Sequence, residues 1–233
     1  RDLHSFPTRR SSDLEIALAS LRAAFLAELP NLTIPTDPGY IDVTSVMVDN
    51  AGVRQNTDYW TSYMYPSSPN GGSFAKCSNN ECEFYQQNSK FYQTLALTPG
   101  TWEFGVSGFH RAGNHNTHFY AGDDKILIPG VPNTEVNSMA EAETYFNNGN
   151  GKVALKFLVE TAGNIEIGID NQDTETDKWT IFRDFTLKYY GAPDYSVYDQ
   201  QWADAVAAAN AAKADAANAN VTGSELTAVN DDL

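Results

Sequence analysis

The strongest constraint on the fold of this chain is a series of short runs of β-branched and aromatic residues between residues 40 and 191. Gly, Pro, Asn and Asp separate the runs, and no long helical pattern interrupts them. Within Val153–Val159, Ile165–Ile169 and Phe185–Tyr189, every second residue is apolar, which places these residues on one face of a strand. The pattern predicts a mainly β protein, an antiparallel jelly-roll β-sandwich with flanking α-helices.

The predicted strands are Ile41–Val48, Tyr59–Tyr65, Glu83–Tyr85, Phe91–Leu97, Thr101–Arg111, Thr117–Ala121, Lys125–Ile128, Val153–Glu160, Asn164–Asp170 and Trp179–Tyr190. The run Thr101–Arg111 is the expected central strand, with Trp102, Phe104 and Val106 on its buried face. It ends in a polar loop, to which it delivers His110 and Arg111.

The segments on either side of the sandwich have different patterns. Residues 1–14 resemble a translated sequencing adapter, and we exclude them as a non-native segment. Residues 15–30 predict an amphipathic helix of a preceding spacer, and 31–39 a linker. Residues 192–233 predict an Ala-rich helical spacer that is cut short. A short helix is expected at 138–147, over one end of the sandwich. We therefore expect an internal fragment of a longer protein, in contact with neighbouring domains of the same chain.

Composition restricts the partners. The formal charge of −15 argues against nucleic acid, which needs clusters of Lys and Arg. No segment predicts a membrane span. An acidic, secreted or cell-surface protein fits this composition best.

Cys77 and Cys82 are the two cysteines, five residues apart across a Ser-Asn-Asn-Glu turn. A metal site would need further ligands nearby. A local disulfide is favoured over free thiols, because an exported protein meets an oxidising environment.

Three stretches resemble a known group of domains: VTSVMVDNAG, CEFYQQNSKFYQTLALTPGTWEFGVSGFHRAG and KWTIFRDFTLKYYG. Together they resemble galactose-binding-like jelly-roll domains, similar to carbohydrate-binding modules of large secreted or surface proteins from glycan-degrading bacteria. The resemblance covers Val43 to Gly191. It implies a glycan or polysaccharide as partner and no cofactor, except that many such domains carry a structural calcium ion between an early strand and the last one. Asp42 and Asp184, with Asp49 and Asp173, are the residues that such an ion would require here.

Sugar rings stack on aromatic side chains, and their hydroxyls bind planar polar groups. The predicted ligand-binding residues are Trp60, Tyr63, Tyr65, His110, Arg111, Asn114 and Asn116. For Trp60 and Tyr63 the alternative is a place in the core of an early strand. His110, His115 and His118 also raise a metal hypothesis, which competes with a ligand-contacting or solvated loop.

The leading functional prediction is a non-catalytic carbohydrate-binding module. The second is a structural spacer or adhesion domain of a tandem surface array without a glycan site. The third is a jelly-roll glycoside hydrolase or lyase domain, for which Glu103 with Glu83 or Asp170 would be the carboxylates. No catalytic motif supports the third reading.

Overall fold

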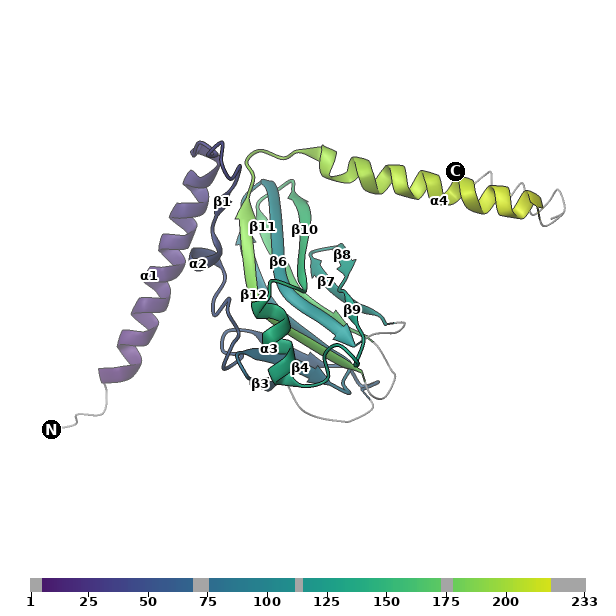
Figure 1. The fold of residues 1–233 in the computed structure, drawn as a ribbon. Helices are drawn as coiled ribbons and strands as arrows, with labels where there is room; N and C mark the ends of the chain where they lie inside the picture. The colour runs from purple at the N-terminus through teal and green to yellow at the C-terminus, as the bar shows by residue number, and fades with distance from the viewer. Residues whose placement is uncertain (1–5, 69–75, 112–114, 173–177, 219–233) are drawn as a thin grey trace. The chain divides into compact units, whose positions relative to one another are not determined.

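Figure 1 shows the fold of the protein in a computed structural model that describes residues 6–68, 76–111, 115–172 and 178–218. The chain divides into two compact units, Arg1–Pro193 and Asp194–Leu233. The first unit contains the strands and the helices α1, α2 and α3, and the second contains α4.

The strands are β1 (Ile41–Asp42), β2 (Thr61–Met64), β3 (Lys76–Ser78), β4 (Glu81–Tyr85), β5 (Ser89–Leu97), β6 (Gly100–Arg111), β7 (Thr117–Ala121), β8 (Asp124–Leu127), β9 (Gly130–Val131), β10 (Lys152–Val159), β11 (Gly163–Asn171) and β12 (Trp179–Tyr189). The helices are α1 (Phe6–Glu28), α2 (Thr44–Met47), α3 (Met139–Asn147) and α4 (Asp199–Asn218), with short 3₁₀ helices η1 (Leu29–Asn31) and η2 (Tyr195–Tyr198).

Two sheets pack face to face. Sheet A has the strand order β10-β6-β12-β4-β3, with β1 paired to β12 and β9 added in parallel beside β6. Sheet B has the order β2-β5-β11-β7-β8, and all of its pairs are antiparallel. The expected central strand is β6, which lies between β10 and β12. The predicted antiparallel jelly-roll β-sandwich with helices is therefore confirmed.

The main core fills the space between the sheets, because each strand turns alternate side chains inward. Trp102, Phe104 and Val106 of β6 are buried there, as their spacing predicted. The ring of Phe104 stacks on Phe119 of sheet B with centroids 4.3 Å apart, and on Phe185 of β12 at 5.6 Å. Aromatic pairs of this kind add roughly 0.5–1.5 kcal/mol to the gain from burial.

Part way along β12, the residues that face the main core switch from even-numbered to odd-numbered positions. A register shift between Arg183 and Thr186 marks a β-bulge. Before the bulge Phe182 faces the main core, and after it Phe185 does. Without the extra residue, the alternation of the strand would turn Phe185 outward.

Asp184 occupies the bulge with φ of 54°, a conformation that residues other than glycine adopt rarely. The neighbouring loop supports it: the N–H of Asp184 donates to the Gly52 carbonyl at 3.1 Å, and the N–H of Phe185 donates to the Ala51 carbonyl at 2.8 Å. Arg54, from the same loop, donates Nε and Nη2 to the Asp184 carboxylate at 2.9 and 2.7 Å.

Helix α3 covers one end of the outer face of sheet A, where the sequence predicted a helix. The Ser138 side chain caps it by accepting a hydrogen bond from the N–H of Glu141. A second, smaller hydrophobic cluster lies beneath the helix and consists of Phe109, Val131, Val136, Ala142, Phe146, Trp179 and Ile181.

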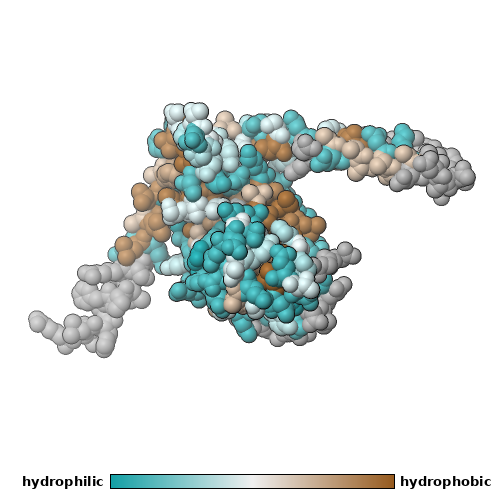
Figure 2. All heavy atoms as spheres, in the orientation of Figure 1, coloured by the Kyte–Doolittle hydropathy of each residue, from teal (hydrophilic) through white to brown (hydrophobic). Residues whose placement is uncertain are grey.

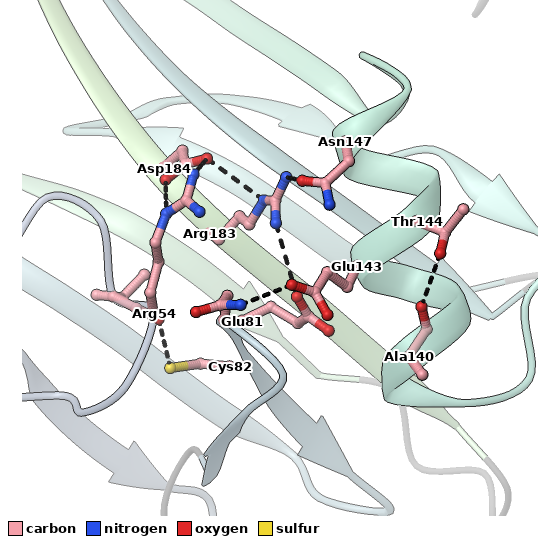
Figure 3. A network of polar contacts seen from close by, with 11 residues as sticks. Arg54, Glu81, Cys82, Ala140, Glu143, Thr144, Asn147, Arg183 and Asp184 are labelled. Carbon is pink, nitrogen blue, oxygen red and sulfur yellow. Dashed lines mark hydrogen bonds and ion pairs between the residues drawn. The ribbon is translucent and has the colours of Figure 1, made fainter.

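A polar network lies beside this cluster (Figure 3). Arg183 donates Nη2 to Asn147 Oδ1 at 2.8 Å, and its Nη1 lies 3.8 Å from Glu81 Oε2. Glu81 and Arg183 are 0% and 4% exposed. Within the described part of the chain, neither carboxylate oxygen of Glu81 accepts a hydrogen bond. Glu81 is therefore a buried acid whose main partner is a guanidinium slightly beyond hydrogen-bonding distance.

Helix α1 is fixed to the sandwich by its C-terminal half. Arg22 donates both terminal nitrogens to the Asp49 carboxylate at 2.9 and 2.6 Å, and its Nε donates to the Val46 carbonyl at 2.7 Å. Leu29, just after the helix, is fully buried. The helix begins at Phe6, whereas the apolar period predicted a start at Glu15.

Residues 14–27 of α1 border a hollow of about 950 Å³ between the helix and sheet B. Figure 2 shows apolar residues gathered along α1. Leu14 and Leu18 line the hollow and are 70% and 43% exposed. The lining is mostly aliphatic, and two of its charged members, Arg22 and Asp49, are paired with each other.

The expected strand Ile41–Val48 is a strand at its first two residues only. From Thr44 the chain forms α2, because Asp42 Oδ1 accepts the Thr44 N–H at 2.9 Å and starts a helical turn. The turn places Val43 and Met47, four residues apart, together in the core. Apolar residues at this spacing fit a single helical turn as well as a strand.

The β3–β4 hairpin includes a strand that the sequence pattern missed. Cys77 and Cys82 are cross-strand partners in it, with Cα atoms 4.0 Å apart, and a disulfide joins them. The predicted pairing of the two cysteines is confirmed.

The second unit is the 3₁₀ helix η2 followed by α4, as the Ala-rich sequence predicted. Tyr195 and Trp202 are 59% and 72% exposed. Among the described residues, no helix combines the length and hydrophobicity needed to cross a membrane.

Candidate binding surface

The outer face of sheet B carries a hollow of about 690 Å³ that polar side chains line. Ile165, Ile167 and Ile169 of β11 point toward the main core, so Glu166 and Asp170 point outward. Register places residues of β5 and β7 beside them. The side chains and backbone that line the hollow come from Lys90, Asn116, His118, Tyr120, Gly122, Asp123, Lys125, Asn164, Ile165, Glu166, Asp170 and Gln172.

Asp170 organises one end of this surface. Its Oδ1 accepts the Tyr65 hydroxyl at 2.9 Å, and its Oδ2 accepts the Gln172 amide at 2.8 Å. The Tyr63 ring meets Tyr65 edge to face at 5.2 Å between centroids. Partial burial, followed by the hydrogen bond to Asp170, raises the pKa of Tyr65 to about 12, so the hydroxyl stays protonated at neutral pH.

Glu166 organises a second cluster. Its Oε1 accepts the Tyr120 hydroxyl at 2.8 Å and also pairs with the Lys90 ammonium. The same ammonium lies 5.3 Å from the Tyr92 ring centroid and 5.0 Å from that of Tyr120. Burial and the bond to Glu166 raise the pKa of Tyr120. The cluster is held in one geometry by mutual contacts.

Gly168 lies between the two clusters on β11. It is the cross-strand partner of Tyr92 on one side and Tyr120 on the other. A Cβ at this position would collide with the backbone of Phe91 and Tyr92, so only glycine fits. Gly168 is itself buried, so it separates the two clusters without adding a side chain between them.

Three of the predicted ligand-binding residues lie at this face. Tyr63 is 48% exposed, Tyr65 belongs to the Asp170 cluster, and Asn116 is an exposed residue at the rim of the hollow. The Asn116 carbonyl accepts the Gln172 N–H at 3.2 Å, which connects the β7 edge to the same cluster.

Trp60 and His110 lie in the interior instead. Trp60 is 8% exposed and stacks on Phe91 and Phe185 with centroids 4.8 and 4.3 Å away, which is the core alternative considered for it. His110 is 0% exposed, with Nδ1 2.8 Å from Thr180 Oγ1 and 3.0 Å from Thr117 Oγ1. Burial, and then the neighbouring His115, lower the pKa of His110 to about 3. Neither side chain is accessible to a ligand.

Arg111 lies on the far side of the molecule, on the outer face of sheet A. Its guanidinium covers the Trp179 ring at 5.1 Å and donates to Asn137 Oδ1 at 3.1 Å. Asn114 lies outside the described residues. The predicted site is therefore not a single surface: its members divide between sheet B, the core and sheet A.

The predicted calcium ligands have other partners. Asp42 starts α2, Asp184 pairs with Arg54, and Asp49 pairs with Arg22. Asp173 lies outside the described residues. Among those that are described, no group of three or more His, Cys, Asp or Glu residues could hold a metal ion. Of the three histidines considered for a metal, His115 stacks on the buried His110 with ring centroids 4.6 Å apart, whereas His118 lies apart from them at the hollow on sheet B.

The carboxylates considered for hydrolysis are also separated. Glu103 faces outward from sheet A, where it accepts hydrogen bonds from Lys188 and Tyr190 at 2.8 and 2.9 Å. Asp170 faces outward from sheet B, and Glu83 accepts from the Trp179 indole. Glu103 and Asp170 therefore lie on opposite sides of the sandwich and do not flank one cleft.

No family model matches this sequence, and no curated protein matches it. Solved structures with a similar fold include a family 61 carbohydrate-binding module in complex with β-1,4-galactotriose, with 13% identity and a TM-score of 0.34 over 60% of this chain and 95% of that chain. The xylan-binding domain CBM22-1 from Paenibacillus barcinonensis has 10% identity and a TM-score of 0.35 over 60% and 92%. A CBM36-1 domain of a multidomain xylanase from the hindgut metagenome of Trinervitermes trinervoides has 18% identity and a TM-score of 0.33 over 58% and 99%. Similarity at this level does not extend to the ligand, so the function has to be argued from the site.

Proposed function

We propose that this protein is a non-catalytic carbohydrate-binding module whose binding surface is the outer face of sheet B. The observation that carries the proposal is the convergence of the Asp170 and Glu166 clusters on one hollow. Tyrosine rings at its edge offer apolar faces for sugar rings. Carboxylates, amides and an ammonium beside them offer the planar and charged partners that sugar hydroxyls need.

Preorganisation supports the same proposal. Tyr65, Asp170 and Gln172 hold one another in place, as do Lys90, Tyr120 and Glu166. A ligand that meets groups already fixed loses less side-chain entropy on binding. A few contacts with a well-hydrated sugar still give modest affinity, so we expect dissociation constants on the order of micromolar to millimolar.

The partners of the carboxylates favour binding over turnover. Glycoside hydrolases need two carboxyl groups that are free to act on the substrate as acid and as base or nucleophile. Glu166 and Asp170 each accept a tyrosine hydroxyl already.

The wider setting we propose is a larger secreted or cell-surface protein. The Cys77–Cys82 disulfide fits an oxidising compartment. The exposed Trp202 and Val206 on α4 favour a role for that helix as a spacer that contacts a neighbouring domain of the same chain. A spacer or adhesion domain without a glycan site is the second candidate for the chain as a whole.

A polysaccharide screen followed by calorimetry tests the proposal. Tyr65→Ala and Asp170→Asn should each weaken binding about 5- to 30-fold, because each removes a contact worth about 1–2 kcal/mol. The matched control is Arg111→Ala, which removes a partly exposed guanidinium from the opposite sheet and should bind like the wild type. Melting temperatures of all variants should be compared first, so that loss of folding is recognised.

The outcomes separate the three candidate functions. Binding that Tyr65→Ala weakens and Arg111→Ala leaves unchanged supports the proposal. A broad screen without binding to the wild type would favour the spacer role. A polysaccharide shortened during the assay would favour a hydrolase or lyase.

A further inference from the structure

A second hollow, of about 390 Å³, lies on the outer face of sheet A and is separate from the surface on sheet B. Its floor crosses three adjacent strands that Figure 1 shows side by side. Ala154 of β10, Gly105 of β6 and Thr186 of β12 are cross-strand partners there. A Cβ at Gly105 would come within 2.5 Å of the Thr186 hydroxyl, so the floor is kept low by the absence of a side chain.

Lys152 and Lys188 line this hollow, together with the carboxylates of Glu103 and Asp184, which are paired with Lys188 and Arg54. Lys156 lies beyond the lining, at the end of the same exposed face of β10. Lys152 and Lys156 are exposed on β10, four positions apart and on either side of Ala154. Their Cα atoms are therefore about 13 Å apart. Lys188 of β12 stands opposite Lys156, across Glu103 of β6. We refer to this surface, with Lys152, Lys156, Lys188 and the floor, as the lysine groove.

Several cations of this acidic protein form ion pairs with carboxylates, whereas two lysines on this face form none among the described residues. Ion pairs join Arg22 to Asp49, Arg54 to Asp184, Lys90 to Glu166, and Lys188 to Glu103. In the described part of the chain, Lys152 and Lys156 have no carboxylate partner, and the Lys156 ammonium instead lies 4.2 Å from the Tyr190 ring centroid. On a chain with formal charge −15, two unpaired lysines on one face are a local site of opposite charge.

The polar groups between the lysines indicate the type of ligand. Ser107 and Thr186 place hydroxyls on the surface, and Glu103 with Lys188 adds a charged pair at one end. Groups of this kind bind the hydroxyls of a sugar, while the two lysines bind its anionic substituents.

An acidic peptide fits this groove poorly. The groove lies over the middle of sheet A, where β6 is paired on both sides with β10 and β12. Backbone N–H and C=O groups that an extended peptide would need are therefore already used. A long polyanion such as nucleic acid would meet the negative charge around this small cationic site.

We propose that the lysine groove binds a short anionic oligosaccharide, one that carries carboxylates or sulfate esters on a sugar backbone. The site is independent of the surface proposed for sheet B, so the two can be tested separately. The domain would then hold two stretches of glycan on opposite sides of the sandwich.

The test uses the full chain, with tetragalacturonate as the carboxylate probe, a sulfated carrageenan tetrasaccharide as the sulfate probe, and the methyl ester of tetragalacturonate as the neutral control. At low salt at least one anionic probe should bind, and the ester should bind at least tenfold more weakly. The affinity should fall several-fold between about 20 and 200 mM salt, as expected for exposed charges.

Variants of the lysines test whether the anionic probes bind in the lysine groove. The double variant Lys152→Gln/Lys156→Gln should weaken binding at least tenfold. The matched control, Lys76→Gln/Lys213→Gln, removes the same charge from residues outside both hollows and should bind like the wild type. Tyr65→Ala should leave anion binding unchanged, which separates this result from that for sheet B.

Binding of neither anionic probe, salt-independent binding, or equal binding by Lys152→Gln/Lys156→Gln would overturn the proposal. Preference for one probe decides whether the anionic groups are carboxylates or sulfate esters.

Discussion

Glu81→Gln should stabilise the fold, by an amount that grows as the pH rises from 4.5 to about 8. Glu81 is fully buried beside α3, accepts no hydrogen bond in the described part of the chain, and has Arg183 3.8 Å away (Figure 3). Burial raises the pKa of Glu81 from 4.5 to about 8. Arg183 opposes this rise in pKa, and Glu143 adds to it. Glutamine keeps the size of the side chain and removes the charge.

The sign follows from proton counts. Between pH 4.5 and about 8, folded protein keeps a proton on Glu81 that the unfolded chain has released. Stability is therefore fully present below pH 4.5 and falls as the pH rises through this window, by at most about 1.4 kcal/mol per pH unit. Glutamine at position 81 removes that dependence.

His110 contributes the opposite slope at lower pH. Burial lowers its pKa from 6.5 to about 3, so between these values the unfolded chain binds a proton that the folded protein does not. Stability from His110 is present above pH 6.5 and is lost as the pH falls. Between pH 4.5 and 6.5, the effects of Glu81 and His110 on the stability of the wild type have opposite signs. Between pH 6.5 and 8, only the effect of Glu81 remains.

The assay is urea unfolding of wild type and Glu81→Gln, followed by tryptophan fluorescence at about pH 5.5, 7.0 and 8.5. His110 is present in both proteins and cancels in the comparison, so the difference in unfolding free energy should grow by up to about 3 kcal/mol between pH 5.5 and 8.5. Glu160→Gln, at an exposed site, is the control and should show no such growth. A difference that stays constant, or that turns against Glu81→Gln as the pH rises, would show that Glu81 is ionised beside Arg183 and refute the reasoning.

Two further predictions concern stability. Trp60→Ala should lower the unfolding free energy in urea by about 3–5 kcal/mol, because it removes the ring that stacks on Phe91 and Phe185. Trp60→Phe keeps a ring at this position and should lower it clearly less. Equal losses in the two variants would contradict this role for Trp60. Native exported protein should contain no alkylatable thiol and should gain the mass of two hydrogens on reduction, since Cys77 and Cys82 are joined; two free thiols before reduction would contradict the pairing.

The alternation of apolar residues predicted which face of most strands is buried. It also predicted a buried position for His110, which the polarity of this residue made us overlook. Trp102, Phe104 and Val106 were assigned to the core by their even positions in β6, and His110 shares that parity. The same period therefore places His110 inside, where two threonine hydroxyls satisfy its ring nitrogen. Its polarity instead suggested a loop residue.

The candidate surface on sheet B could be predicted only in part. The inward isoleucines of β11 imply that Glu166 and Asp170 face outward, and this signal was available in the sequence. The partnership of Asp170 with Tyr65 depends on which strands are neighbours and in which register. Periodicity within one strand carries no information on pairing between strands 105 residues apart.

The bulge in β12 has a consequence for recognising relatives of this protein from sequence. A comparison that assumes uniform alternation across Trp179–Tyr189 would match buried positions of one protein to exposed positions of another over half of the strand. A relative without the extra residue at Asp184 needs a one-residue gap there before its Phe185 and Leu187 equivalents align. An alignment of distant homologues should therefore begin by placing this gap at Asp184. Arg54, which pairs with Asp184 from a loop near the start of the sandwich, is a second position that helps to locate it.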